Sequence, residues 1–421
     1  MKANKYILNA VLALAGVSMF ASCSEEELGP TIFPHVSTEL DPTSYTYKFD
    51  TWLNQNFRTM YNVDFKYKLE DVEIDMQYNL IPATLLNSKE LAALTKYLWF
   101  DAYGELDSPE FLKMYAPRIL CLVGSSAHNP ASGTETLGLA EGGLKITLFK
   151  VNEMQEHDMG QMNEYYFRTM HHEFAHILHQ TKSYPVEFNT LTNRYYDPSN
   201  WQNKDWGQMA SLGMITNYGS SAAREDFAET IANYVTRTDD QLEMILWFAG
   251  KGYSDGLPEG AEVDPTEEKT YYSYYLFKSE QDRLDQNPTY IYNVFDRATV
   301  SKGTLVDGEP YTPRDKNGNE VQVGILYKAG VYDPITDQYF TRVETAEAHL
   351  KELEERFGEV LAVADNDGIK GDEMILQKQS IARNWFKDVW NLDLDKLREI
   401  VQRRQYDYDL PALLAEIENI N

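Results

Sequence analysis

Hydrophobic and polar residues alternate along the chain with two different periods, which predicts a mixture of helices and strands. Four stretches place apolar residues three and four positions apart, as amphipathic helices do: 43–61, 88–103, 161–180 and 221–236. Three shorter stretches have the pattern of strands: 63–69, 118–124 and 143–151. Asn87 followed by Glu90 has the spacing of a capping box and is expected to open the second helix. Because strands and helices precede residue 161 and mostly helices follow it, the sequence predicts an α+β fold.

The region 251–371 differs from its surroundings. It contains clusters of Gly, Asp and Pro, and the run Lys316-Asn317-Gly318-Asn319 precedes an extended segment, 321–326. Asn-Gly between extended runs is a strong hairpin signal, so we interpret this region as an insertion that contains hairpins. Helical periodicity returns from Met374 to Arg404. The chain is thus expected to divide into five parts: signal peptide 1–22, tether 23–36, core 37–250, insertion 251–371 and C-terminal helices 372–421.

The first 22 residues have the features of an export signal. A short basic region precedes an almost wholly apolar run, Ile7–Phe20, which is too short for a bilayer span of ~20 residues. Small residues then lead into Cys23, which predicts a lipoprotein whose mature chain begins at a lipidated Cys23. An ordinary secretory peptide cut near Ala21 is the alternative. The other cysteine, Cys121, lies in an apolar run and is expected in the core.

Composition excludes one class of partner. Asp and Glu outnumber Lys and Arg by 66 to 38, which gives a formal net charge of −28. Nucleic acid and anionic lipid repel a chain this acidic, so nucleic-acid binding is excluded and membrane attachment is expected only through the lipid anchor. The 29 tyrosines and 7 tryptophans would suit stacking on sugars or peptides, but core and interface roles explain most of them more simply.

Four of the eight histidines lie within ten residues, HHEFAHILHQ (171–180). His172 and His176 are four apart, so on a helix both imidazoles lie on one face and can reach one zinc ion at ~2.0–2.1 Å. Glu173 is then placed to take a proton from a water molecule that attacks a carbonyl. The apolar residues between them predict a buried helix, in which unpaired histidines would be costly without a metal. The segment therefore predicts a Zn²⁺ site with Glu173 as general base.

The two remaining histidines of this segment have other expected roles. His171 is turned about 100° from His172 and is expected to be a hydrogen-bonded core or surface residue. His179 shares the face of His172 and His176 but lies ~10 Å along the axis from His172, too far for the same ion. We interpret His179 as supporting the site or facing the substrate, with a purely structural role as the alternative.

The third zinc ligand must come from another segment, and Arg224-Glu-Asp-Phe-Ala-Glu229 is the best candidate. Glu225 and Glu229 are four apart on one face of a predicted helix, so either could bind the ion while the other orients a ligating histidine. Asp226 is turned about 100° away from them. Tyr218, in a turn just before this helix, is suited to stabilising a tetrahedral oxyanion.

HHEFAHILHQ followed some fifty residues later by EDFAE resembles the gluzincins, zinc peptidases whose third ligand is a glutamate. Within them the chain is similar to the zinc-binding metallopeptidases known as substrate import-associated zinc metallohydrolase lipoproteins. The resemblance covers about residues 40–250 and 372–405 and implies a zincin-like fold, with a small mixed sheet, an HExxH helix and a mostly helical C-terminal part. It favours Glu225 as the ligand and Glu229 as the partner of a ligating histidine. It also implies an outer-membrane lipoprotein at the cell surface, beside nutrient importers and their substrate-binding lipoproteins.

The leading functional hypothesis is a surface-anchored zinc peptidase that cuts proteins, peptides or glycoproteins for import. Leu144, Ile146 and Leu148 alternate with polar residues, which predicts an edge strand, and the substrate is expected to pair antiparallel with residues 144–150. A non-catalytic glycan- or peptide-binding lipoprotein with a vestigial zinc site is the alternative, although a binder would not need a base such as Glu173. A zinc hydrolase acting on a non-peptide amide or ester is a third hypothesis.

Overall fold

The computed structural model describes residues 40–69, 79–128, 135–136, 138–141, 144–251, 272–285, 287–358, 360–361 and 370–420. The described residues from Lys48 onward belong to one compact unit, which contains the elements below apart from the first residue of α2. The predicted signal peptide, the tether and the lipidated Cys23 lie outside the described residues. No helix within the described ranges is long and apolar enough to cross a membrane.

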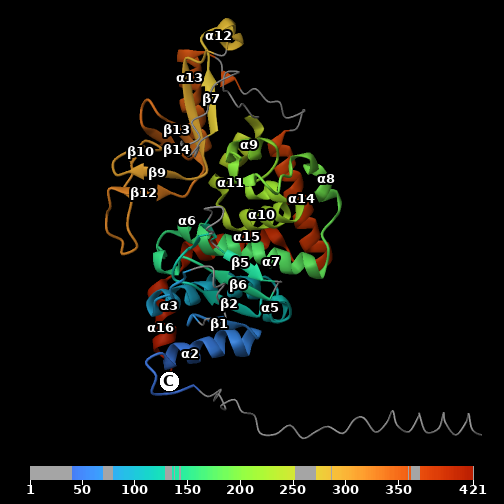
Figure 1. The fold of residues 1–421 in the computed structure, drawn as a ribbon, viewed down its shortest axis with the longest axis vertical. Helices are drawn as coiled ribbons and strands as arrows, with labels where there is room; N and C mark the ends of the chain where they lie inside the picture. Colours follow the sequence, from blue (N-terminus) through green and yellow to red (C-terminus); the bar gives the residue numbers. More distant parts are fainter. Residues whose placement is uncertain are drawn as a thin grey trace, which may run out of the picture. The chain divides into compact units, whose positions relative to one another are not determined.

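A four-stranded mixed sheet forms the β part of the core (Figure 1). In the order β1-β2-β6-β5, its strands are Asp64–Lys66, Ile119–Leu122, Lys145–Leu148 and Gly138–Glu141. The first three are parallel, and β5 pairs antiparallel with β6. A separate short pair consists of β3 (Ala127–His128) and β4 (Glu135–Thr136). The strands predicted within 63–69 and 118–124 are therefore confirmed.

The prediction that residues 144–150 form an edge strand is wrong. β6 is paired on both sides, with β2 and with β5, and all four of its residues are buried. Lys145 and Thr147, which the sequence pattern placed on a solvent-facing side, are 7% and 4% exposed. Alternation of polar and apolar residue types did not reveal that this strand is covered on both faces. Within the described residues, the free edge beside β6 belongs to β5.

Helices pack beside this sheet from the N-terminal part of the chain: α2 (Tyr47–Leu53), η1 (Asn54–Thr59), α3 (Leu85–Thr95), η3 (Lys96–Phe100), α4 (Asp101–Leu106) and α5 (Pro109–Tyr115). The prediction that Asn87 caps the second helix is wrong, because α3 begins at Leu85 and the Thr84 hydroxyl accepts the hydrogen bond from the Asn87 backbone N–H. The Asn87 side chain instead donates to the Val151 carbonyl at 2.7 Å, which ties α3 to the segment after the sheet.

The four histidines lie in one continuous helical run, called the histidine helix below: α6 (Met159–Met162), the π-helical η5 (Asn163–Phe167) and α7 (Arg168–Thr181). α7 packs against α10 (Ala223–Thr236), and α14 (Gly371–Trp390) and α15 (Leu394–Asp407) pack on α10 (Figure 1). The remaining helices of this part are η4 (Val151–Glu153), α8 (Glu187–Leu191), η6 (Asn193–Tyr195), η7 (Trp201–Asn203), α9 (Trp206–Ser211), η8 (Tyr218–Ser221), α11 (Asp239–Lys251) and α16 (Leu410–Glu418). The helices predicted at 161–180 and 221–236 are confirmed.

One hydrophobic core joins these layers and fixes the histidine helix in place. It includes Leu120 and Ile146 from the sheet, Phe174 from α7 and Trp385 from α14, all at most 1% exposed. Burying one large apolar side chain contributes ~1.5–3 kcal/mol, so the apolar face of α7 determines which way its polar face points. The architecture is α+β, as the sequence predicts.

Between α11 and α14 the chain forms a second β region, drawn in yellow to orange in Figure 1. Its larger sheet has the order β11-β10-β14-β13-β8-β7-β15: Glu309–Pro310, Leu305–Val306, Gln338–Phe340, Gly330–Asp333, Tyr290–Phe295, Tyr272–Leu276 and Val360–Leu361. The other elements are β9 (Ala298–Ser301), β12 (Val323–Leu326), α12 (Glu280–Leu284) and α13 (Val343–Phe357). The expected Asn-Gly turn is present, with Gly318 at φ +78°. However, β12 pairs with β9, and the strands beside the turn form an isolated bridge between Arg314 and Glu320.

The two ends of this insertion lie side by side. α11, which precedes it, packs against α14, which follows it. A Cβ added to Gly250 would lie 3.2 Å from Asp372 Oδ2, so the chain leaves and re-enters the core at nearly the same point. A second hydrophobic core, containing Phe248 of α11, Ile375 of α14 and Val331 of β13, joins the insertion to both helices.

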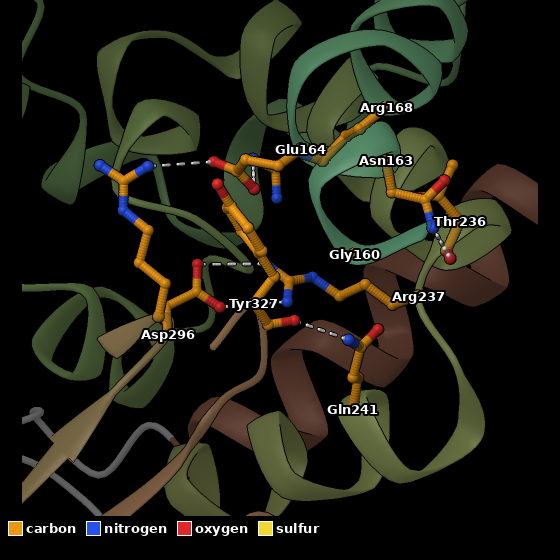
Figure 2. A pocket seen from close by; sticks show the side chains of 10 residues that line it. Gly160, Asn163, Glu164, Arg168, Thr236, Arg237, Gln241, Asp296 and Tyr327 are labelled. Carbon is orange, nitrogen blue, oxygen red and sulfur yellow. Dashed lines mark hydrogen bonds and ion pairs between the residues drawn. The ribbon is translucent and has the colours of Figure 1, made fainter. Parts of the chain in front are cut away.

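Figure 2 shows a polar pocket where η5 meets the insertion. Glu164 forms an ion pair with Arg168 within the histidine helix, and Arg297 Nη1 lies 3.8 Å from Glu164 Oε1. Arg237 Nη1 lies 3.0 Å from Asp296 Oδ1. The pocket has a volume of about 20 Å³, which is enough for a water molecule only. We therefore interpret it as a packed ionic contact between core and insertion.

Candidate metal centre

His172 and His176 lie one turn apart on α7 and point their Nε2 atoms at the same place. Phe174, Ala175 and Leu178, which alternate with them, are at most 1% exposed, so packing of the apolar side directs both imidazoles toward α10. The two Nε2 atoms are 3.0 Å apart.

Glu225 of α10 completes a cluster of three ligand atoms. Its Oε2 lies 2.9 Å from His176 Nε2 and 3.3 Å from His172 Nε2. Three atoms bound to one zinc ion at ~2.0–2.2 Å are necessarily about 3–3.5 Å from one another, so this donor set has the spacing that zinc needs. Burial acts to raise the pKa of Glu225, but hydrogen bonds with both imidazoles and Arg224 outweigh it and lower that pKa, which keeps the carboxylate ionised.

The other nitrogen of each imidazole is held by a neighbouring side chain. Glu229 Oε1 lies 2.7 Å from His172 Nδ1, and His179 Nε2 lies 2.8 Å from His176 Nδ1. Contacts of this kind fix ring orientation and leave Nε2 for a metal. Burial acts to raise the pKa of Glu229, but its contacts with His172 and other groups lower it to about 2. His179 thus lies beside the cluster without belonging to it, and His171, buried against Tyr103, points elsewhere.

Glu173 lies at the edge of the cluster, where a base is needed. One carboxylate oxygen of Glu173 and one nitrogen each of His172 and His176 lie within 4.8 Å of one another. Burial raises the pKa of Glu173 above its ordinary value, although the two imidazoles oppose this. A carboxylate with a raised pKa close to the cluster is better suited to exchanging a proton than to permanent ion pairing.

Tyr218 lies on the α10 side of the same cluster. Its ring centroid is 5.7 Å from that of His172, and Trp201 packs edge-on against it at 4.8 Å. Burial and the nearby carboxylate of Glu225 raise the pKa of the Tyr218 hydroxyl above its usual value. The phenol therefore stays protonated and can donate a hydrogen bond.

Asp226, next in sequence to Glu225, faces away from the histidines. It is fully buried, and its Oδ2 accepts hydrogen bonds from Lys378 of α14 at 2.5 Å and from Tyr196 at 2.8 Å. Lys378 also donates to the Gly213 carbonyl at 2.8 Å. This pair connects the C-terminal helices to α10 directly beside the cluster.

Sequence reasoning missed several residues that hold the site carboxylates. Thr216 donates to Glu229 Oε2 at 2.8 Å, and the Asn233 side chain contacts the same oxygen at 3.2 Å. Asn233 follows Glu229 by four residues, so helical spacing could have suggested it. Lys378 is 152 residues from Asp226, and no local pattern links the two.

Comparisons with known proteins identify the family of this chain. Residues 42–264 of the 421 match a family described as "Putative zinc-binding metallo-peptidase". A crystal structure of a protein from Bacteroides caccae, itself described as a "putative zinc-binding metallo-peptidase", is similar with a TM-score of 0.52 and 28% sequence identity. That similarity covers 86% of this chain and 94% of the other, whereas no curated protein matches. Since the family match spans more than half of the sequence, this chain belongs to that family of zinc-binding metallopeptidases.

Proposed function

We propose that the protein is a zinc-dependent peptidase of the gluzincin type. The observation that carries this proposal is the convergence of His172 Nε2, His176 Nε2 and Glu225 Oε2 beside the carboxylate of Glu173. The α+β fold supports it, because the histidine helix packs on α10, which carries Glu225, and lies near β5.

The residues present fit a zinc ion. Two nitrogens and one carboxylate oxygen form the three-ligand set of hydrolytic zinc sites, which keep a further position open. Glu229 and His179 lie beside the two Nδ1 atoms, so when the imidazoles are neutral the tautomers with Nε2 free are favoured. A zinc ion bound there would lower the pKa of water to about 7 and polarise a substrate carbonyl.

The side chains around this position have separate roles in the reaction. Glu173 takes the proton of the attacking water at its carboxylate and returns it to the departing amine. The Tyr218 hydroxyl donates a hydrogen bond to the oxygen that gains negative charge. Glu229 and His179 keep the two imidazoles oriented while this happens.

We propose that the substrate is an extended segment of a protein, peptide or glycoprotein that pairs with β5. The substrate cannot pair with residues 144–150, as the sequence predicted, because both edges of β6 are occupied. Among the described residues β5 pairs on one side only, and it packs near α7, so its other edge can add one more strand.

Purified mature protein, incubated with a broad peptide library with and without zinc chelator, tests the activity. We expect chelator-sensitive cleavage, and we expect Glu173→Gln to retain zinc but lose a factor of ~10²–10⁴ in turnover. Near-normal turnover of that variant would show that Glu173 is not the general base. A zinc-loaded parent that binds peptides without cutting them would favour the non-catalytic binder, and hydrolysis of esters alone would favour the non-peptide hydrolase.

We further propose that the protein is an outer-membrane lipoprotein at the cell surface, linked to nutrient import. The small residues before Cys23 support this proposal. Cys23→Ser should release the protein from membranes or leave it unprocessed, as measured by fractionation and mass spectrometry. Normal acylation and retention of that variant would contradict the anchor. Protease accessibility on intact cells tests the surface location, and co-purification tests contact with an importer.

A further inference from the structure

Two adjoining clefts separate the start of the histidine helix from the insertion. Their volumes are about 680 and 490 Å³, within the range of ligand sites in proteins. One wall comes from the chain around Asp158, Met159 and Tyr165, and the other from Tyr311 to Lys328 of the insertion. Both clefts touch Asp158, Met159, Tyr311, Ile325 and Tyr327, so they form one continuous groove, called the insertion groove below.

The insertion groove exposes apolar side chains that a core would normally cover. Val323 and Ile325 of β12 are 52% and 40% exposed, and Tyr406 at the end of α15 is 90% exposed. Exposed apolar groups gathered in a concave surface indicate a binding site more often than scattered ones do. Opposite charges also balance along its lining, which contains three carboxylates and three cations: Glu153, Asp158 and Asp315, and Arg314, Lys316 and Lys328. In a chain with a formal net charge of −28, this groove is close to neutral.

The walls of the insertion groove are held before any ligand binds. The Tyr327 hydroxyl donates to the Tyr165 hydroxyl at 3.4 Å, across the two walls. Lys150 Nζ lies 5.0 Å from the centroid of the Tyr165 ring, and the Tyr311 hydroxyl donates to the Ile325 carbonyl at 3.3 Å. A groove held in this way binds with less loss of conformational entropy than a mobile loop would.

The histidine helix connects the insertion groove to the metal centre. Tyr165 precedes His172 by seven residues and Met159 precedes it by thirteen, which corresponds to about 10 and 20 Å along a helix axis. An extended chain advances ~3.3 Å per residue. A polypeptide bound at the metal centre could therefore reach the groove with a segment about three to six residues from the bond that is cut.

We propose that the insertion groove is an exosite that binds an unfolded polypeptide segment of the substrate. This inference rests on the proposed peptidase function. Aliphatic side chains together with tyrosine rings suit the mixed apolar and polar side chains of a polypeptide, and the balanced charge does not select for a charged ligand. The site would make the enzyme prefer protein substrates to short peptides.

Kinetics of the zinc-loaded mature protein on three substrates test this proposal. The substrates are a reduced and alkylated protein without glycans, a glycosylated protein, and a short peptide with about two residues on either side of the same cleaved bond. The double variant Val323→Ser/Ile325→Ser and the single variant Tyr406→Ala alter the groove. Ile335→Ser is the matched control, because Ile335 is 70% exposed on the same insertion but does not line the groove.

We expect the groove variants to raise KM for the unglycosylated protein roughly fivefold or more, with kcat unchanged and the short peptide unaffected. The control should behave like the parent on every substrate. Equal KM values for parent and groove variants on the unglycosylated protein would overturn the exosite. An effect confined to the glycosylated protein would also overturn it, because the occupant would then be a glycan.

Direct binding separates this proposal from the peptidase function. The unglycosylated protein is titrated onto chelator-treated parent and groove variants, and binding is measured by interferometry without any hydrolysis. Weaker binding to the groove variants supports the exosite even if the parent cleaves no substrate. Absence of cleavage by the parent would contradict only the peptidase proposal. Unchanged binding overturns the exosite.

Discussion

The two sides of α10 carry carboxylates that are neighbours in sequence but differ in how their charge is balanced. On the side of α14, Asp226 is paired with the buried ammonium of Lys378 at 2.5 Å. On the side of α7, Glu225 and Glu229 contact imidazoles, and the nearby cation Arg224 is itself 70% exposed. The α14 side thus contains its own cation, the ammonium of Lys378. On the α7 side, the carboxylate of Glu225 and the imidazole nitrogens surround a position that a metal cation can occupy.

This difference separates a structural ion pair from a metal centre. A buried carboxylate is costly unless an opposite charge and hydrogen bonds compensate for it, and Lys378 does so for Asp226. In the metal-free chain an imidazole takes that role beside Glu225. Burial lowers the pKa of His172, but hydrogen bonds with Glu225 and Glu229 outweigh it and raise the pKa to about 10. The two sides of α10 should therefore respond differently to substitution, to metal removal and to protons.

The largest contrast is expected between Glu225→Ala and Glu229→Ala. Loss of Glu225 removes a direct ligand, so the purified variant should contain little zinc and lose more than ~100-fold in activity. Loss of Glu229 removes only the partner of His172, which typically costs 10–100-fold in affinity or activity. Metal content by mass spectrometry and turnover of both variants decide the assignment. Full zinc loading of Glu225→Ala would move the third ligand to Glu229, and full loading of both variants would mean that neither glutamate is the third ligand.

A second contrast comes from the other side of the helix. Lys378→Met leaves Asp226 buried without its cation, which should lower the free energy of unfolding by roughly 3–5 kcal/mol. Zinc content of the folded protein should stay close to that of the parent, because Asp226 faces away from the histidines. Chemical denaturation measures the loss. Adding Asp226→Asn to Lys378→Met should recover part of it, and no recovery would mean that Lys378 stabilises the fold mainly through Gly213.

The smallest contrast is expected in the number of protons that zinc binding releases. At pH 7 the raised pKa of His172 means that its imidazole is protonated in the metal-free chain, and zinc can bind Nε2 only after that proton leaves. Zinc binding should release about one proton, visible by titration calorimetry in buffers of different ionisation enthalpy. In Glu229→Ala a partner that raises this pKa is absent, so fewer protons should be released. Equal release by parent and variant would contradict the role of Glu229.

The sequence predicts the parts of the site that lie on one helix or on two neighbouring ones. Four-residue spacing is enough to bring His172 and His176 together, and it also places Glu225 and Glu229 on one face of α10. The site residues remain predictions until metal and activity are measured, but the structure brings all four side chains into contact.

What the sequence could not predict depends on contacts between distant segments. The inner position of β6 depends on pairing with β5, a segment of four residues whose pattern alone does not identify a strand, and the burial of Lys145 depends on coverage of both sheet faces. Thr84 and Asn87 are both good capping residues, and the hydrogen bond from Asn87 to the distant Val151 carbonyl decides between them. Partners 152 residues apart, such as Asp226 and Lys378, leave no periodic signal.

The meeting of α11 and α14 at the base of the insertion has an evolutionary consequence. Because Gly250 and Asp372 lie next to each other, the chain between them can lengthen, shorten or be exchanged as a module while α7, α10 and the four-stranded sheet stay continuous. The entropy of closing such a loop grows only slowly with its length, so large changes in module size cost little stability. A lineage can in this way acquire new recognition surfaces while the metal centre stays unchanged, and selection can act on the module without altering the catalytic residues.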